Sequence, residues 1–234
     1  MMHVLDTGIQ SAESNMLLDE KLLSELDPNG VPILHLYKWA AQSATFGFFI
    51  APKKHLDLEK AQKWNLDLGR RPTGGGIVFH IWDLAFSFLM PAGHRAFSLN
   101  TLQNYEFVNR AVLETVRAYF GLSGELIQQN GPDLGPGCQN FCMAKPTIYD
   151  VVHQGVKIAG AAQRRRKQGY LHQGTISLAA PNIALLEDVL LSKEDVVHAM
   201  KMFTFAPVKG EELGRVRTEI EKLLADKLKE SLNF

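Results

Sequence analysis

The sequence predicts an α+β fold with a mixed, mostly antiparallel central sheet flanked by helices. Three observations support this fold class: an amphipathic helical stretch near the start, several short strand-like runs in the middle, and helical runs that close the chain. The 234 residues are 46% hydrophobic and 21% charged, which is ordinary globular composition. We expect a main unit over residues 1–180 and a C-terminal helical extension, residues 181–234, packed on it.

The N-terminal part opens with a helix and continues with short strands. Ser11 to Leu26 carries apolar residues at helical spacing, and Ser11 is a suitable N-cap. Asp27 to Gly30 is a turn signal. Ile33 to Trp39 alternates as a strand does, and Ala44 to Phe49 is a second short apolar segment.

The middle of the chain alternates between helical and strand-like pieces. Leu56 to Asn65 reads as a short helix, and Leu66 to Arg70 as a strand. Ile77 to His80 and Leu84 to Met90 are expected to pair as a hairpin. The long run from Leu99 to Phe120 has one apolar stripe and predicts a helix that ends before Gly121.

The C-terminal part begins with residues 123–146, which are rich in Gly and Pro. An irregular stretch of that length is usually functional. Three strand-like runs follow and then two helices, which we expect at Thr147–Val152, Val156–Gly160, Gln173–Leu178, Leu185–Leu191 and Gly210–Leu232.

Charge and hydropathy exclude several classes of protein. The 25 basic residues balance the 25 acidic ones, so a dedicated nucleic-acid binder is not expected. No apolar run is long enough to span a bilayer, and no signal peptide is evident, so we expect no membrane association. The 2 cysteines, Cys138 and Cys142, fit a reducing, cytoplasmic location better than a disulfide framework.

The most distinctive stretch is a triple glycine that follows two arginines and precedes an apolar run. Glycines let the backbone approach a ligand closely, and exposed N–H groups in such a turn attract anions. Arginine adds a planar fork that suits phosphate or carboxylate. The alternative is a plain glycine turn with solvated arginines. We predict a ligand-binding loop made of Arg71, Gly74, Gly75, Gly76, Ile77, Val78, Phe79 and His80.

A second candidate is Lys157, which lies among small residues in a predicted strand. Ala159, Gly160 and Ala161 leave room for a substrate beside it. A lysine in such a segment can be partly desolvated and can face an anion. The alternative is a strand with one outward lysine.

Together these segments resemble the lipoate-protein ligase A and octanoyltransferase family. The resemblance covers about residues 10–180 in a consistent order. It rests on Asn15–Glu20, Tyr37–Trp39, Arg70–His80, Lys157–Gln163 and His172–Gly174. It implies a fold similar to biotin protein ligases and class II synthetases, and it adds Gly160 and His172 to the expected substrate-binding residues.

The resemblance also implies the chemistry. In the ligases of the family, the loop matching Arg71–Phe79 binds an acyl-adenylate made from lipoate and ATP with Mg²⁺. In the octanoyltransferase branch, a cysteine takes the acyl group from acyl carrier protein, and Cys142 matches that cysteine. A nearby ammonium, here Lys157, would lower the thiol pKa and make it nucleophilic. The alternative for Cys142 is a buried, inert thiol.

Departures from the family pattern favour ATP-independent transfer. Ile81 follows His80 where many members have Asp, and Val156 replaces a common arginine. The expected activity is therefore transfer of an octanoyl or lipoyl group to a lysine of a lipoyl domain, with Cys142 and Lys157 as catalytic residues. Expected acceptors are lipoyl domains of 2-oxoacid dehydrogenases or the glycine-cleavage protein. No metal or tightly bound cofactor is expected.

Two other activities remain open at this stage. One is an ATP-dependent lipoate-protein ligase that forms lipoyl-AMP. The other is a non-catalytic module that binds an acyl group or a partner. The basic run Arg164–Lys167 is either a solvated turn or a docking patch for an acidic carrier or lipoyl domain.

Overall fold

The structure is a computed structural model that describes residues 1–129, 141 and 146–233. Both cysteines therefore lie outside the described residues. Among the helices that are described, none is long and apolar enough to cross a membrane.

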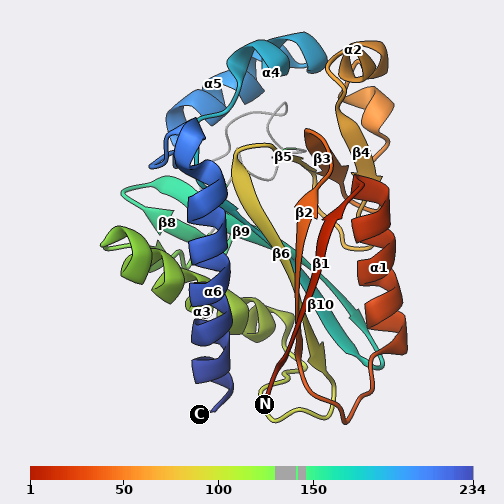
Figure 1. Cartoon of the computed structure of the whole chain (residues 1–234), viewed down its shortest axis with the longest axis vertical. Helices are drawn as coiled ribbons and strands as arrows, with labels where there is room; N and C mark the ends of the chain where they lie inside the picture. The colour runs from red at the N-terminus through yellow and green to blue at the C-terminus, as the bar shows by residue number, and fades with distance from the viewer. Residues whose placement is uncertain (130–140, 142–145, 234) are drawn as a thin grey trace.

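A seven-stranded sheet forms the centre of the molecule (Figure 1). The strand order is β1-β2-β6-β10-β9-β8-β7, and every neighbouring pair except the parallel β1–β2 pair is antiparallel. β6 and β10 are buried along their whole length because they lie in the middle of this sheet. The strands are β1 (His3–Gln10), β2 (Ile33–Trp39), β6 (Asp83–Pro91), β7 (Glu125–Leu126), β8 (Val151–His153), β9 (Val156–Arg166) and β10 (Gly169–Ser177).

Helices cover the two faces of this sheet. α3 (Thr101–Phe120) and α6 (Leu213–Leu232) pack together on one face, where the largest hydrophobic cluster lies. α1 (Ala12–Glu25) covers the other face and contributes Met16 and Leu23 to smaller clusters. Figure 1 shows α1 on the opposite side of the sheet from α3 and α6.

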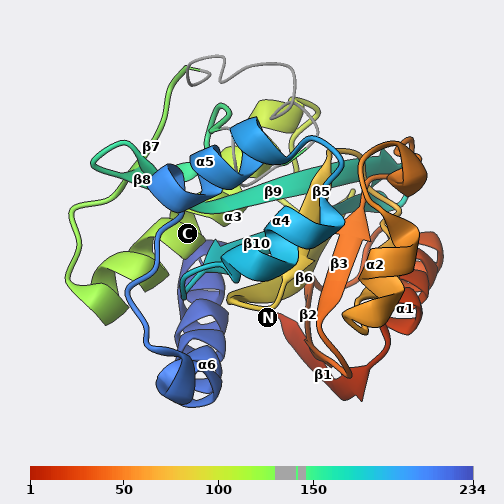
Figure 2. The same cartoon turned by 90° about the horizontal axis from the view of Figure 1, so that it is seen from above.

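A second, three-stranded sheet stands beside the first. β3 (Ser43–Phe46) lies between β4 (Asp67–Arg70), which is parallel to it, and β5 (Ile77–His80), which is antiparallel. Residues from three short helices complete the hydrophobic cluster of this sheet, and the course of these helices can be followed in Figure 2. These helices are α2 (Leu58–Lys63), α4 (Ile183–Val189) and α5 (Lys193–Phe203), and a 3-10 turn, η1 (Pro52–Lys54), precedes α2.

The predicted fold class is confirmed, but some elements differ from the prediction. The expected hairpin is wrong: β5 pairs with β3 in the small sheet, while β6 pairs with β2 and β10 in the large one. The sequence also did not predict β1, α5 or the division into two sheets. β1 escaped detection because its residues are mostly exposed or half-buried and show no clear apolar alternation.

Candidate functional site

A buried ion pair between Lys157 and Asp150 forms the centre of the candidate site. Lys157 Nζ lies 2.7 Å from Asp150 Oδ2, and both side chains are only 3% exposed. The main-chain N–H and the hydroxyl of Thr147 also donate to Asp150 Oδ2, at 2.7 and 3.0 Å. Because a buried carboxylate needs such partners, Asp150 is held in place and in turn fixes the ammonium of Lys157.

Gly160 provides the space that the lysine side chain occupies. A Cβ atom at this position would lie 2.6 Å from Lys157 Cε and 2.7 Å from its Nζ. Only a glycine therefore lets the side chain of Lys157 lie across β9 without displacement. This gives a physical reason for the glycine that the sequence pattern pointed out.

The triple-glycine turn is held by the guanidinium of Arg71, which is 5% exposed. Its Nη2 atom donates to the carbonyl oxygens of Gly74 and Gly76, at 3.1 and 2.8 Å. Its Nη1 atom donates to the hydroxyl and the carbonyl of Thr45 on β3, at 2.7 and 3.1 Å. Arg71 thus ties the turn to the small sheet, and the turn has a defined shape before any ligand binds.

The glycine turn and Lys157 line one cavity of about 240 Å³. We call it the turn cavity. The two features that the sequence indicated separately therefore belong to one site. Its wall includes Gly74, Gly75, Gly76, Tyr105, Phe141, Thr147, Lys157, Ala161, Ala162 and Gln163.

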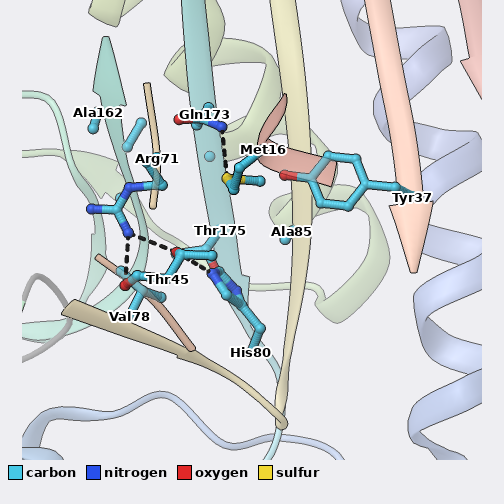
Figure 3. A pocket seen from close by; sticks show the side chains of 13 residues that line it. Met16, Tyr37, Thr45, Arg71, Val78, His80, Ala85, Ala162, Gln173 and Thr175 are labelled. Carbon is cyan, nitrogen blue, oxygen red and sulfur yellow. Dashed lines mark hydrogen bonds between the residues drawn. The ribbon is translucent and has the colours of Figure 1, made fainter. Parts of the chain in front are cut away.

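A narrower and more apolar cavity adjoins the turn cavity, and Ala161 and Ala162 line both. We call it the apolar cavity. Figure 3 shows Arg71, Thr45 and Val78 on one side of it, and Met16 and Tyr37 on the other. Its free volume is about 30 Å³, which is room for no more than about two water molecules. It is therefore nearly filled by its own side chains.

His80 closes the end of β5 in a hydrogen-bonded cluster. Its Nε2 atom lies 2.8 Å from the hydroxyl of Thr45, and its Nδ1 atom lies 2.7 Å from Asp83 Oδ2. Asp83 also accepts a hydrogen bond from Thr175 on β10, and Trp39 stacks on the imidazole at 4.4 Å between ring centroids. His80 therefore joins the two sheets beside the apolar cavity.

A second buried network supports the other side of the turn. The hydroxyl of Thr73, just before the glycines, donates to Gln173 Oε1 at 2.6 Å, and Gln173 Nε2 donates to Asp19 Oδ2 at 2.6 Å. Asp19 also pairs with His35 at 2.7 Å and accepts from Ser87 at 2.5 Å. Because these groups are buried and hydrogen-bonded, they restrict the position of the turn.

His172 lies behind the turn cavity and does not line either cavity. Its Nδ1 atom accepts a hydrogen bond from Gln163 at 2.8 Å, and its ring lies 5.7 Å from that of Tyr105. Gln163 and Tyr105 are themselves wall residues. Complete burial lowers the pKa of His172 to about 3, so the imidazole is neutral.

The side chains of β5, the strand after the glycines, point alternately toward the candidate site and toward the hydrophobic core. Val78 and His80 line the apolar cavity, whereas Ile77 and Phe79 pack in the hydrophobic cluster of the small sheet. This follows from the alternation of side chains along a strand. Sequence reasoning missed Asp150 and Thr45, although Asp150 ends the motif that contains Cys142. Cys142 itself lies outside the described residues.

Comparison with known proteins identifies relatives over most of the chain. It is 32% identical to an octanoyltransferase LipM of Anoxybacillus flavithermus over 194 residues, which are 80% of this chain and 67% of that protein. It is 30% identical to octanoyltransferase LipM of Bacillus subtilis, over 84% of this chain and 72% of that protein. These similarities confirm the predicted enzyme class.

Solved structures with a similar fold are lipoate ligases. A lipoate-protein ligase A bound with ATP has a TM-score of 0.71 and 22% identity, over 99% of this chain and 85% of that one. A bi-partite lipoate protein ligase from Thermoplasma acidophilum, studied with its E2 lipoyl domain, has a TM-score of 0.72 and 22% identity, over 100% of this chain and 84% of that one. The sequence profile of the lipoyl protein ligase A/B catalytic domain matches residues 11–210. On this evidence, the chain belongs to the lipoyl protein ligase A/B catalytic-domain family.

Proposed function

We propose that this protein transfers an octanoyl group from a carrier-protein thioester to a lysine of a lipoyl domain, through a thioester on Cys142. The observation that carries the proposal is the adjoining pair of cavities, with the buried Lys157 ammonium in one and apolar walls in the other. Such a pair suits a polar reacting group joined to an aliphatic tail. The octanoyltransferases that resemble the chain support the choice of acyl group.

The proposed reaction has two steps. The Cys142 thiol gives up its proton, its thiolate attacks the thioester carbonyl, a new C–S bond forms, the C–S bond to the carrier breaks, and the carrier sulfur takes up the proton. The neutral amine of the acceptor lysine then attacks the Cys142 thioester, the C–N bond of the amide forms, the C–S bond to Cys142 breaks, and the proton lost by the amine goes to the Cys142 sulfur. In both steps the Lys157 ammonium stabilises the negative charge that develops on sulfur or oxygen.

Two residues that flank the undescribed part of this segment support a role for Cys142. Phe141 directly precedes Cys142, and Thr147 follows five positions later; both line the turn cavity beside Lys157. In the sequence, Cys142 therefore lies between two residues that line the proposed reaction site.

The apolar cavity must widen to receive the acyl chain. Its 30 Å³ is far less than an eight-carbon chain needs. Met16 is the most adaptable side chain in its wall, because an unbranched thioether has several rotatable bonds. We infer that displacement of Met16 accompanies binding of the tail.

Mass spectrometry after incubation with octanoyl carrier protein tests the proposal. An increase by one octanoyl group on Cys142, followed by its transfer to a lipoyl-domain lysine, is the expected result. Cys142→Ala should abolish both steps. If the wild-type protein gains no octanoyl group but modifies the domain directly, the thioester route is wrong.

The second candidate function is ATP-dependent ligation of lipoate. The similarity to an ATP-bound lipoate ligase favours it at the level of fold, and the glycine turn resembles an anion site. Lipoate-dependent exchange between ATP and pyrophosphate would support it. In that case Cys142→Ala should retain its activity.

A further inference from the structure

A group of aromatic and basic side chains, most of them exposed, lies beside the glycine turn of the turn cavity. We call it the aromatic–basic rim and define it as Phe48, Phe49, Lys53, Lys54, Arg70 and Arg164. Phe49 is 89% exposed and Phe48 is 42% exposed, although phenylalanine is a large apolar residue. Adjacent exposed aromatic side chains commonly mark an interaction site.

Hydrogen bonds attach the rim directly to the glycine turn. Phe48 N donates to the carbonyl of Thr73 at 2.9 Å, and Gly47 N donates to that of Gly76 at 3.1 Å. A Cβ atom at Gly47 would lie 2.0 Å from the carbonyl oxygen of Gly75. The segment that carries the two phenylalanines therefore lies in backbone contact with the glycine turn, which forms part of the wall of the turn cavity.

Two arginines, one from β4 and one from β9, complete the rim. Arg70 Nη1 donates to the carbonyls of Phe48 and Ile50, at 2.6 and 3.1 Å. The guanidinium of Arg164 lies 5.1 Å from the centre of the Phe48 ring, and it donates to the carbonyl of Pro72 at 2.9 Å. Figure 2 shows the end of β9 beside the segment that links β3 to α2.

The rim has a positive charge that nearby carboxylates only partly neutralise. Glu20 lies 3.7 Å from Arg164, so the charge of this arginine is shared. Arg70, Lys53 and Lys54 are exposed, and none of the three forms an ion pair with a carboxylate within the described part of the chain. A partner that fits this surface must supply negative charge and a small apolar contact for Phe49.

We propose that the aromatic–basic rim docks the acceptor: a small acidic protein domain that presents its lysine to the turn cavity. This inference rests on the proposed function. A lysine has only a four-carbon stem, so the domain that carries it must sit close to the turn cavity, and the rim lies beside the glycine turn of that cavity. An acyl group delivered on a long flexible carrier arm would not need so close a surface.

Direct binding tests this proposal separately from catalysis. An unlipoylated lipoyl domain with an acidic surface is titrated with the full-length wild-type protein and with a Phe49→Ser/Lys53→Glu/Lys54→Glu variant. The matched control is Lys222→Glu/Lys229→Glu, which makes the same change in net charge at exposed positions on α6. Circular dichroism shows whether each variant is folded.

The expected result is at least about tenfold weaker binding by the rim variant and less than about twofold change in the control. Binding by the wild type should also weaken between about 50 and about 500 mM salt. Equal binding by the rim variant and the control, or no binding by the wild type, would overturn the docking surface. Binding without acyl transfer would instead overturn the proposed function and leave the docking surface supported.

Discussion

Lys157 makes a structural contact and also has a chemical role in the proposed mechanism. Its ammonium forms the buried pair with Asp150 and lies in the wall of the turn cavity. A side chain in both roles will affect stability and activity together when it is removed. Variants that separate the two effects are therefore needed to establish its role.

Replacing Lys157 and then Asp150 should separate the effect of the ion pair on stability from its effect on activity. Lys157→Met leaves a buried carboxylate without its cation, which we expect to lower the free energy of unfolding by about 3 kcal/mol. Adding Asp150→Asn removes the uncompensated charge and should restore most of that loss. Activity should remain at least about 100-fold below wild type in both variants, because neither has the ammonium. Denaturant unfolding and steady-state kinetics measure the two quantities.

Gly160→Ala should reduce activity while the protein still folds. The added methyl group would lie 2.6 Å from Lys157 Cε, 2.7 Å from its Nζ and 3.0 Å from Asp150 Oδ1, so the flexible end of the lysine must shift, although its ion pair with Asp150 can re-form in the new position. We expect kcat/KM to fall at least about tenfold, since small displacements of a catalytic group are costly. Gly214→Ala is the control, because a Cβ atom there meets nothing within 4 Å. Unchanged kinetics in Gly160→Ala would show that the position of the ammonium is unimportant.

At the scale of elements, α6 is joined to the rest of the fold by one side chain in particular. Arg217 Nε donates to the carbonyl of Asp83 at 2.7 Å, and its Nη2 donates to that of Ile81 at 2.8 Å. These carbonyls lie where the chain passes from β5 to β6. The helix therefore holds the link between the two sheets, in addition to its packing on α3.

Arg217→Ala should therefore destabilise the protein more than Arg215→Ala on the same helix. Loss of the two charge-assisted hydrogen bonds should cost about 1.5–3 kcal/mol. Arg215 is 60% exposed, and within the described residues its ion pairs are with Glu212 and Glu219, in the turn before the helix and in the helix itself, so its loss should destabilise the protein less than the loss of Arg217. Thermal unfolding of the two variants provides the comparison. Equal melting temperatures would mean that the Arg217 contacts contribute nothing.

The sequence was informative where local pattern and tertiary environment agreed. α1, β2 and α3 have clear periodicity, and the structure places them at nearly the predicted residues. The pairing of β5 was not predictable, since its apolar run fits any sheet and only tertiary contacts decide which one. The same holds within the site: the triple glycine and Lys157 were recognisable by residue type, whereas Asp150 and Thr45 become relevant only through contacts that folding creates.

For the whole molecule, His172 predicts a dependence of stability on pH. Burial lowers its pKa to about 3 from an ordinary value of 6.5, so between these values the unfolded chain binds a proton that the folded chain does not. Its contribution to stability is therefore fully present above about pH 6.5 and is lost as the pH falls toward 3, by up to about 1.4 kcal/mol per pH unit.

The measurement is chemical unfolding at a series of pH values, for the wild type and for His172→Gln. Glutamine has no titratable group, so the free energy of unfolding of this variant should fall less steeply below pH 6.5. Parallel curves for the two proteins would assign the acid sensitivity to other groups. The comparison of slopes is informative even if the variant is less stable at every pH.

The apolar cavity lies at the seam between two sheets, since Thr45 and Val78 come from the small one and Ala85 and Thr175 from the large one. A molecule bound there would contact both sheets, which are also joined by the hydrogen bonds of His80 and Asp83, by that of Thr73 with Gln173, and by the short link between β5 and β6. Binding of a molecule in the apolar cavity would then stabilise the contacts between the two sheets, and these contacts would in turn strengthen its binding. A substitution that weakens the contacts between the sheets, even far from the cavity, should therefore weaken binding of a ligand there, by a factor no greater than the one by which that ligand stabilises the contacts.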